Sequence, residues 1–309
     1  MTAHNLFRVF HKSLFRCAAP FAVAVAVACA PEPTEPPLDP SDDCPSGCSF
    51  ELPGLPNRQG MHQVGVYENG DVLVVGGRRH GQVDAIADVF LLRGSADSWS
   101  ELAPLLEPRV LHQLSVLNDG RALVTGGFDA GGIEGTEELP SATSTWRSAG
   151  DLQTERAEHA QVLHSDGDVY VFGGLFGPGA QTSAERWDAS AAGSWTSLPS
   201  IPSNFSAGSA VELEDGDVLL TGGILDGDTL SRRAYRFDVD ERSWTRVGDL
   251  QHARMTHTST LLPDGRVLVA GGYALRSAEV FDPSTNTFRL VGDMAEVRER
   301  HSATTVIGG

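Results

Sequence analysis

Lysine is nearly absent from this 309-residue chain, which contains only Lys12. A catalytic Schiff base and a Walker-type phosphate site both need a lysine, so neither is expected after residue 12. Basic residues are also few, because 23 Lys and Arg stand against 41 Asp and Glu, a formal charge of −18. Nucleic-acid binding needs basic residues that displace phosphate counterions, so this charge argues against it. It argues equally against electrostatic docking on anionic lipid.

The N-terminal apolar run is too short to span a bilayer. It covers Ala18 to Ala28 with an interruption at Pro20, whereas a spanning helix needs about 20 residues. Three basic residues and no acidic residue precede Cys29, and small residues lie directly before it. This pattern predicts a bacterial export signal over residues 1–28.

Cys29 is the expected site of lipid attachment. The residues Ala26, Val27, Ala28 and Cys29 resemble a lipobox, at which bacterial lipoproteins are cleaved and acylated, although Ala26 replaces the usual Leu. Acyl chains would hold the protein on a membrane, so the lipid anchor is the only membrane contact expected. The alternative is plain cleavage before Cys29, which leaves a periplasmic or secreted protein with a free thiol.

Residues 29–48 read as an anchor followed by a spacer, because prolines and acidic residues dominate them. Cys44 and Cys48 lie in the sequence CPSGC, and in an oxidising envelope we expect them to form a disulfide with a small loop. Cys17 leaves with the signal, and no cysteine follows Cys48. A metal site at this pair would need more Cys or His nearby, so no metal is expected.

A repeat of about 49 residues organises the remaining chain. Double glycines recur at 76–77, 126–127, 173–174, 222–223 and 271–272. An Asn-Gly or Asp-Gly pair precedes each doublet, and a histidine lies eight residues before the glycine of that pair in four repeats. Gly208 takes this place in the fourth repeat. An aromatic residue lies thirteen before this place, at Trp99, Trp146, Trp195, Trp244 and Phe288. Landmarks in register at this period indicate a stacked or radial array.

Each repeat predicts a four-stranded antiparallel sheet, whose strands we call A to D. Apolar runs on both sides of Asp-Gly predict an A–B hairpin with a two-residue turn, and Gly-Gly then permits close approach or a sharp exit. A third run such as AERW and a fourth that carries the tryptophan supply strands C and D. One such sheet buries too little surface alone, so the sheets are expected to pack radially as a β-propeller.

The repeats resemble the Kelch family. The resemblance rests on the apolar strand, Asp-Gly, Gly-Gly, the spaced tryptophan and the Ala-Glu-x-Phe-Asp segment at 278–282, with its counterpart at 184–188. It covers roughly residues 50–307. Strand C departs from the pattern at Glu138, Leu139 and Pro140 and at Tyr235, where irregularity is expected.

The predicted fold is all-β: a Kelch β-propeller over residues 49–309, with five complete blades and a partial sixth. The repeats lie near 62–111, 112–158, 159–207, 208–256 and 257–300, and the partial one at 301–309. The stretch from Phe50 resembles a D strand, and the stretch from His301 an A strand. Two readings remain open: an unusual ring with an incomplete blade, or a fragment of a longer chain, which we favour slightly. An exposed apolar edge at the gap would promote aggregation.

Antiparallel order places the B–C and D–A connections on one face, the B–C face, and the A–B and C–D turns on the opposite face, the A–B face. The B–C loops differ between repeats, and variable loops on a rigid scaffold are where recognition usually occurs. The candidate ligand-binding residues in these loops are Arg78, Arg79, His80, Asp129, Phe176, Asp226, Asp228, Arg232, Arg233, Tyr273 and Arg276. Four arginines on D–A connections join them: Arg109, Arg156, Arg254 and Arg298.

The recurrent Arg and His have a structural interpretation that we favour. The arginines can pair with strand C acids, at Asp88, Glu138, Glu185 or Glu279, and the histidines can satisfy buried carbonyls. Turn chemistry likewise explains the Asp-Gly pairs without calcium, because the spacing of a calcium loop is absent.

Catalytic patterns are missing from the chain. Copper enzymes of the galactose-oxidase type need a Tyr linked to Cys, and the propeller has no cysteine. No Asp box, G-x-S-x-G, H-E-x-x-H or P-loop occurs, so we expect no catalytic residue and no cofactor.

The function we expect is therefore a non-enzymatic binding or scaffolding module at a bacterial cell envelope. Its unknown partner, a protein or a glycan, would contact the B–C face. The alternative is a carbohydrate-active propeller, of epimerase or hydrolase type, that uses an arginine-rich face at the central channel.

Overall fold

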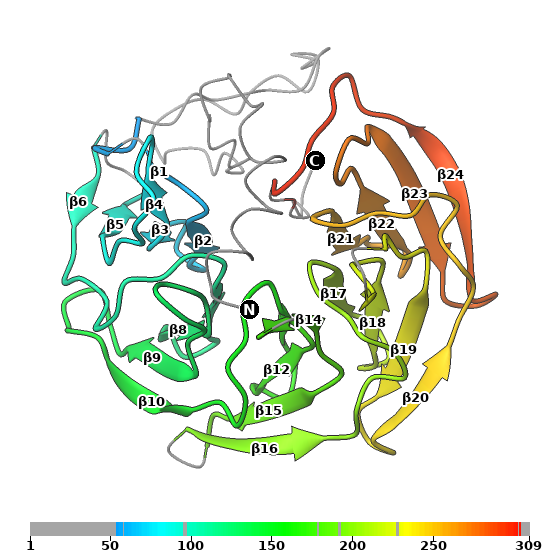
Figure 1. Ribbon diagram of the computed structural model, residues 1–309, viewed down its shortest axis with the longest axis horizontal. Coiled ribbons are helices and arrows are strands. Elements are labelled where there is room, and N and C mark those ends of the chain that lie inside the picture. Colours follow the sequence, from blue (N-terminus) through cyan, green and yellow to red (C-terminus); the bar gives the residue numbers. More distant parts are fainter. Residues whose placement is uncertain are drawn as a thin grey trace, which may run out of the picture.

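The computed structural model describes residues 54–57, 59–94, 98–177, 179–190, 193–226, 229–301 and 303. The expected signal, Cys29, the spacer, the Cys44–Cys48 pair and Asp228 lie outside these residues. So does the partial sixth blade, apart from His301 and Ala303. Among the described residues there is no α-helix, and five four-stranded sheets are arranged around an axis (Figure 1).

The five sheets each contain four antiparallel strands in chain order, which confirms the expected blades. Blade 1 contains β2 (Gln63–Val66), β3 (Val72–Val75), β5 (Val89–Leu92) and β6 (Ser100–Glu101). Blade 2 contains β7 (Gln113–Val116), β8 (Ala122–Thr125), β9 (Gly135–Leu139) and β10 (Arg147–Asp151). Blade 3 contains β11 (Ala160–Leu163), β12 (Val169–Phe172), β15 (Ala184–Asp188) and β16 (Ser194–Leu198).

Blades 4 and 5 continue the ring in the same order. Blade 4 contains β17 (Ser209–Glu212), β18 (Val218–Thr221), β19 (Ala234–Asp238) and β20 (Ser243–Arg246). Blade 5 contains β21 (Thr258–Leu261), β22 (Val267–Ala270), β23 (Ser277–Asp282) and β24 (Thr287–Asp293). Two small sheets lie outside the blades. β1 (Gln59–Gly60), in the segment before β2, pairs with β4 (Arg78–Arg79) in the B–C loop of blade 1, and β13 (Leu175–Phe176) pairs with β14 (Gly179–Ala180) in the B–C loop of blade 3.

The core lies between neighbouring blades rather than inside any one of them. Strand B is almost wholly buried in each blade, because its alternate side chains face the blades on either side. Four apolar clusters join blades 1 and 2, 2 and 3, 3 and 4, and 4 and 5. The A strands lie nearest the axis, and the D strands β6, β10, β16, β20 and β24 form the rim (Figure 1).

The A–B turns differ from the expected two-residue turns. In blade 2, Leu117 N–H donates to Arg121 O (2.7 Å), and Gly120 N–H donates to Leu117 O (2.9 Å). The loop therefore has three residues, a type I turn followed by a glycine bulge with φ 85° at Gly120. All five blades repeat this geometry, so Asn/Asp-Gly still marks the turn, although not the predicted type.

Strand C is more regular than its sequence indicates. In blade 2 the irregularity lies opposite β9, where the register of β10 shifts between Ser148 and Asp151. In blade 4, β19 pairs with β18 and β20 without a shift, so the irregularity expected at Tyr235 is absent.

The glycine doublets bring each blade against the next connection. Gly127 N–H donates to Arg156 O (2.8 Å), and a Cβ on Gly126 would lie 2.4 Å from that same oxygen. Both glycines have positive φ (56° and 113°). A side chain at Gly126 would therefore push the blades apart, which explains why the doublet recurs.

A main-chain belt links successive D–A connections around part of the axis. Ala207 N–H donates to Glu158 O (2.8 Å), Thr256 N–H to Ala207 O (2.7 Å), and Arg300 N–H to Thr256 O (2.9 Å). These residues have positive φ although none is glycine, a strained conformation that the surrounding ring must hold. Arg300 also contacts the buried Glu158 carboxylate, so an ion pair links two positions of the belt.

Candidate functional site

Most of the predicted B–C loop residues lie at the surface. The exposed ones are Arg79, His80, Asp129, Phe176, Asp226, Arg232, Tyr273 and Arg276, while Arg78 and Arg233 are half-buried. Arg79 pairs with Asp88 (3.1 Å), and Arg276 pairs with Asp293 (3.0 Å). These residues come from the B–C loops of all five blades, so they share a face without forming one compact cluster.

Three of the four connection arginines are buried instead. Arg109, Arg156 and Arg254 have no exposed side-chain surface. Arg254 Nη2 donates to Glu279 Oε1 (2.6 Å), and Arg109 and Arg156 contact Glu137 and Glu185 in the same way. The glutamate in blade 2 is thus Glu137 rather than the neighbouring Glu138. A guanidinium held inside a blade is not presented to a ligand.

The paired glutamates also fasten the D–A connections. Glu279 accepts hydrogen bonds from the backbone N–H groups of Gln251 (2.7 Å) and His252 (3.0 Å). Arg254 in turn donates to Ser277 O (3.2 Å). Connection, strand C and glycine doublet are therefore bound into one unit. Arg298, the fourth connection arginine, is exposed.

The recurrent histidines lie between blades and stay neutral. His112 Nε2 contacts Val75 O (3.1 Å), and His257 Nε2 contacts Thr221 Oγ1 (2.8 Å). Burial, and secondarily the nearby connection arginine, lowers the pKa of each of these two histidines to about 3. The same causes lower the pKa of His159 well below its ordinary value. A histidine with so low a pKa is neutral near pH 7, so it joins blades and is poorly suited to proton transfer.

Blade 4 replaces this polar unit with apolar side chains. Phe205 stands in the place of the arginine, Tyr235 in that of the glutamate, and Gly208 in that of the histidine. A Cβ on Gly208 would lie 2.4 Å from the Phe205 ring, so the glycine makes room for that ring. Three positions thus change together. Sequence reasoning noted Gly208 and Tyr235 as separate departures from the repeat, but it did not recognise Phe205 or connect the three.

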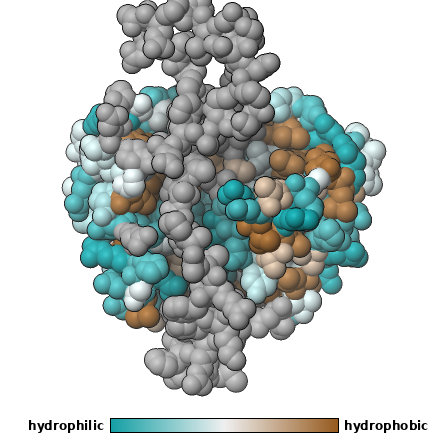
Figure 2. Space-filling view, turned by 90° about the horizontal axis from the view of Figure 1, so that it is seen from above, coloured by the Kyte–Doolittle hydropathy of each residue, from teal (hydrophilic) through white to brown (hydrophobic). Residues whose placement is uncertain are grey.

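Exposed apolar side chains concentrate on the B–C face. Five of the eight large hydrophobic residues that are exposed in the described part of the chain lie on its connections: Val83, Leu106, Phe176, Tyr273 and Val297. Sequence reasoning named only Phe176 and Tyr273, although apolar residues within predicted loops would have indicated the others. Elsewhere on the ring, hydrophobic and hydrophilic residues are intermingled in the edge-on view (Figure 2).

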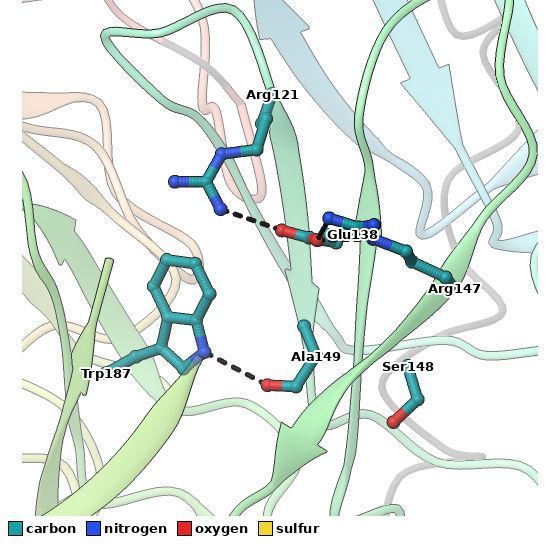
Figure 3. A pocket seen from close by; sticks show the side chains of 6 residues that line it. All are labelled: Arg121, Glu138, Arg147, Ser148, Ala149 and Trp187. Carbon is teal, nitrogen blue, oxygen red and sulfur yellow. Dashed lines mark hydrogen bonds and ion pairs between the residues drawn. The ribbon is translucent and has the colours of Figure 1, made fainter. Parts of the chain in front are cut away.

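A separate cavity of about 310 Å³ lies toward the A–B face, between blades 2 and 3 (Figure 3). Its lining combines two arginines, one glutamate and the edge of a buried indole. The lining residues are Arg121, Glu138, Arg147, Ser148, Ala149 and Trp187. None of them is among the candidate ligand-binding residues predicted from the sequence, although Glu138 was expected to pair with an arginine.

Over the described ranges, no three His, Cys, Asp or Glu side chains lie close enough together to hold a metal ion. Within those ranges, too, no helix has the length and apolar character that crossing a bilayer requires.

Comparisons with known proteins point to the same repeat. The pattern of the family described as Kelch motif matches residues 253–295. Kelch-like protein 23 of Mus musculus is 25% identical over 244 residues, covering 76% of this chain and 42% of that protein. Kelch-like protein 25 of Homo sapiens is 27% identical over 238 residues, covering 71% and 38%. The chain thus spans about two fifths of the length of these relatives.

A solved structure shares the fold. The structure of YjhT superposes with a TM-score of 0.67 and 17% identity, covering 79% of this chain and 88% of that chain. Together with the five blades, these similarities support a Kelch-repeat β-propeller.

Proposed function

We propose that this Kelch-repeat β-propeller is a non-enzymatic binding module that engages a protein or glycan through its B–C face. A propeller of this type is commonly a protein-binding scaffold. The observation that carries the proposal is the difference in burial between the recurrent residues and the variable ones. Three of the four recurrent arginines, with their glutamates and the histidines His112, His159 and His257, make buried contacts between connections and blades. Most of the loop residues that differ from blade to blade are exposed on one face.

The composition of that face suits recognition. Phe176 exposes 46% of its surface and Tyr273 38%, and arginines such as Arg79 and Arg232 lie in the same set of loops. Aromatic residues and arginine are the side chains that most often dominate binding energy at interfaces. Loops anchored on a rigid ring lose little conformational entropy when they bind.

The binding test compares two double variants with the wild type. Purified chain is presented to an envelope-protein fraction and a glycan array, and the affinity for each ligand found is measured. Phe176→Ala with Tyr273→Ala is expected to weaken binding by about tenfold or more. The matched control, Leu290→Ala with Val291→Ala, removes exposed apolar residues of the rim strand β24 and should leave the affinity unchanged.

Equal affinity in both double variants would contradict the assignment of the B–C face. Turnover of a sugar by the wild type would replace the binding function with the enzymatic alternative.

For the cellular location, we propose an exported protein held at the bacterial envelope by lipid on Cys29, with residues 30–48 as spacer. The support is the basic segment, the short apolar run and the small residues before Cys29. Cys29→Ser should move the protein from the membrane fraction to the soluble fraction, because the acyl chains are lost. Unchanged membrane retention of the variant would contradict lipid anchoring.

A further inference from the structure

The cavity between blades 2 and 3, which we call the blade 2–3 cleft, exists because one rim residue is small. Ala149 on β10 occupies the register position that Leu198 holds on β16 and that Val247 holds after β20. A methyl group in place of a branched side chain leaves unfilled space in an otherwise close-packed interface. The register shift between Ser148 and Asp151 lies at this same place.

The charges at the cleft are reversed relative to the neighbouring blades. In blades 3 and 4, an arginine on strand C contacts the aspartate that follows the A–B turn, as Arg186 does with Asp168. In blade 2, Glu138 holds the strand C position, and Arg121 follows the turn. A second cation, Arg147, is added from β10.

Both guanidiniums of the cleft are held in place. Arg121 Nη1 donates to Glu138 (2.8 Å), Arg121 Nε donates to Asp119 (2.7 Å), and the guanidinium lies 5.5 Å from the Trp187 ring centroid. Arg147 Nε donates to the other Glu138 oxygen (2.6 Å). Figure 3 shows the two arginines approaching Glu138 from opposite sides. Fixed donors reduce the entropy that a ligand must overcome.

Two carboxylates balance the two arginines of the cleft, and one of the two guanidiniums stays exposed. Glu138 is buried and balances one of the two arginines, while Asp119 binds Arg121 from outside the lining. Arg147 exposes 64% of its side chain, so its guanidinium remains accessible to a ligand. The exposed Ser148 beside it supplies a hydroxyl donor. Most of the surface of a chain of charge −18 repels anions, whereas the exposed Arg147 guanidinium beside Ser148 can bind one.

We propose that the blade 2–3 cleft binds a carboxylate presented by an acidic peptide segment of a partner protein. A guanidinium pairs with a carboxylate through charge-assisted hydrogen bonds, often two at once, and Ser148 can add another. The cavity volume is at the lower limit of ligand pockets, which suits one acidic side chain better than a large molecule. The cleft lies on the opposite face from the B–C loops, so it is a second contact point.

The test measures binding of a fluorescent oligoglutamate peptide to the full chain by anisotropy at low salt, where surface electrostatics are least screened. Arg147→Ala is expected to weaken binding by about tenfold, the effect of losing one charge-assisted contact. The matched control is Arg289→Ala, because Arg289 holds the corresponding register on β24 and is exposed. Its affinity should equal that of the wild type.

Two further arms separate the cleft from general charge attraction. Ala149→Leu keeps every charge but fills the space, and it should weaken binding while thermal unfolding confirms that the variant is folded. Free glutarate should compete only at a much higher concentration than the peptide, and competition at equal concentration would overturn the peptide assignment. Absence of wild-type binding, or equal loss in Arg147→Ala and Arg289→Ala, would overturn the site itself. B–C face variants should not affect this binding, so failure here is distinguishable from failure of the proposed function.

Discussion

Removal of the Arg156 guanidinium should destabilise the propeller strongly. Arg156 has no exposed side-chain surface, and it donates to Gly173 O (2.6 Å) and Ser183 Oγ (3.0 Å) besides its ion pair with Glu185. In Arg156→Ala, the Glu185 side chain, 2% exposed, keeps a hydrogen bond from Gln153 N–H (2.7 Å) but loses its counter-charge. A buried carboxylate without its cation is costly, because the protein interior solvates an unpaired charge poorly.

The expected loss is about 3–5 kcal/mol of the free energy of unfolding, the usual cost of removing one partner of a buried ion pair. Screening by solvent does not reduce this value, because neither partner is exposed. The loss would be a large share of the roughly 5–15 kcal/mol that stabilises a typical protein.

Blade 4 supplies the matched experiment, because it builds the same junction from apolar residues. The triple variant Arg156→Phe, His159→Gly and Glu185→Tyr copies Phe205, Gly208 and Tyr235 into blade 3. Replacing a whole buried ion pair by packed apolar groups is often neutral or stabilising, so the triple variant should recover most of the loss.

Urea unfolding followed by circular dichroism measures both variants. The control is Arg79→Ala, which breaks the exposed pair with Asp88 and should cost about 0–1 kcal/mol. Arg156→Ala within about 1 kcal/mol of the wild type would refute the structural role of the buried pairs. A triple variant no more stable than Arg156→Ala would refute the equivalence of the two kinds of junction.

Two further predictions concern acid and glycine. Burial keeps the pKa of His112 and His257 near about 3 in the folded chain, whereas the unfolded chain takes up protons below about pH 6.5. Stability should therefore fall as pH drops from about 6.5 toward 3, by about 1.4 kcal/mol per pH unit for each histidine. Urea unfolding at several pH values checks this. The double variant His112→Gln with His257→Gln should show a flatter dependence of the free energy of unfolding on pH, and a slope equal to that of the wild type would refute the assignment. A Cβ at Gly173 would lie 2.1 Å from Phe205 O at φ 61°, so Gly173→Ala should cost more than about 1 kcal/mol. Gly131→Ala, with open space around it, should be nearly neutral, and equal melting temperatures for the two would contradict the close approach.

The repeat made the blades predictable from sequence. Asp-Gly, Gly-Gly and the spaced tryptophan set strand order and connection lengths, because each landmark marks a fixed place in a sheet of four strands. The turn type was less accessible: the same Asp-Gly serves a two-residue turn and a three-residue turn with a glycine bulge. Only the Leu117–Arg121 hydrogen bond distinguishes them.

The site was predictable in part. Exposure of variable loop residues such as Phe176 follows from their place on a rigid scaffold. The recurrence of the connection arginines favoured a structural role, and their pairing with Glu185 and Glu279 is confirmed, whereas Arg109 pairs with Glu137 and not with Glu138. Their complete burial could not be predicted, because arginine is usually exposed. The blade 2–3 cleft was beyond reach, since it depends on Ala149 lying opposite a tryptophan of the next blade.

The belt joins successive blades through peptide groups, so its hydrogen bonds do not depend on the identity of the side chains. Glu158, Ala207, Thr256 and Arg300 hold the same left-handed conformation although one is acidic, one is basic and two are small. Substitutions at Ala207 and Thr256 can therefore change the chemistry beside the axis while the peptide hydrogen bonds between blades remain. At Glu158 and Arg300 the same freedom costs the ion pair that joins them.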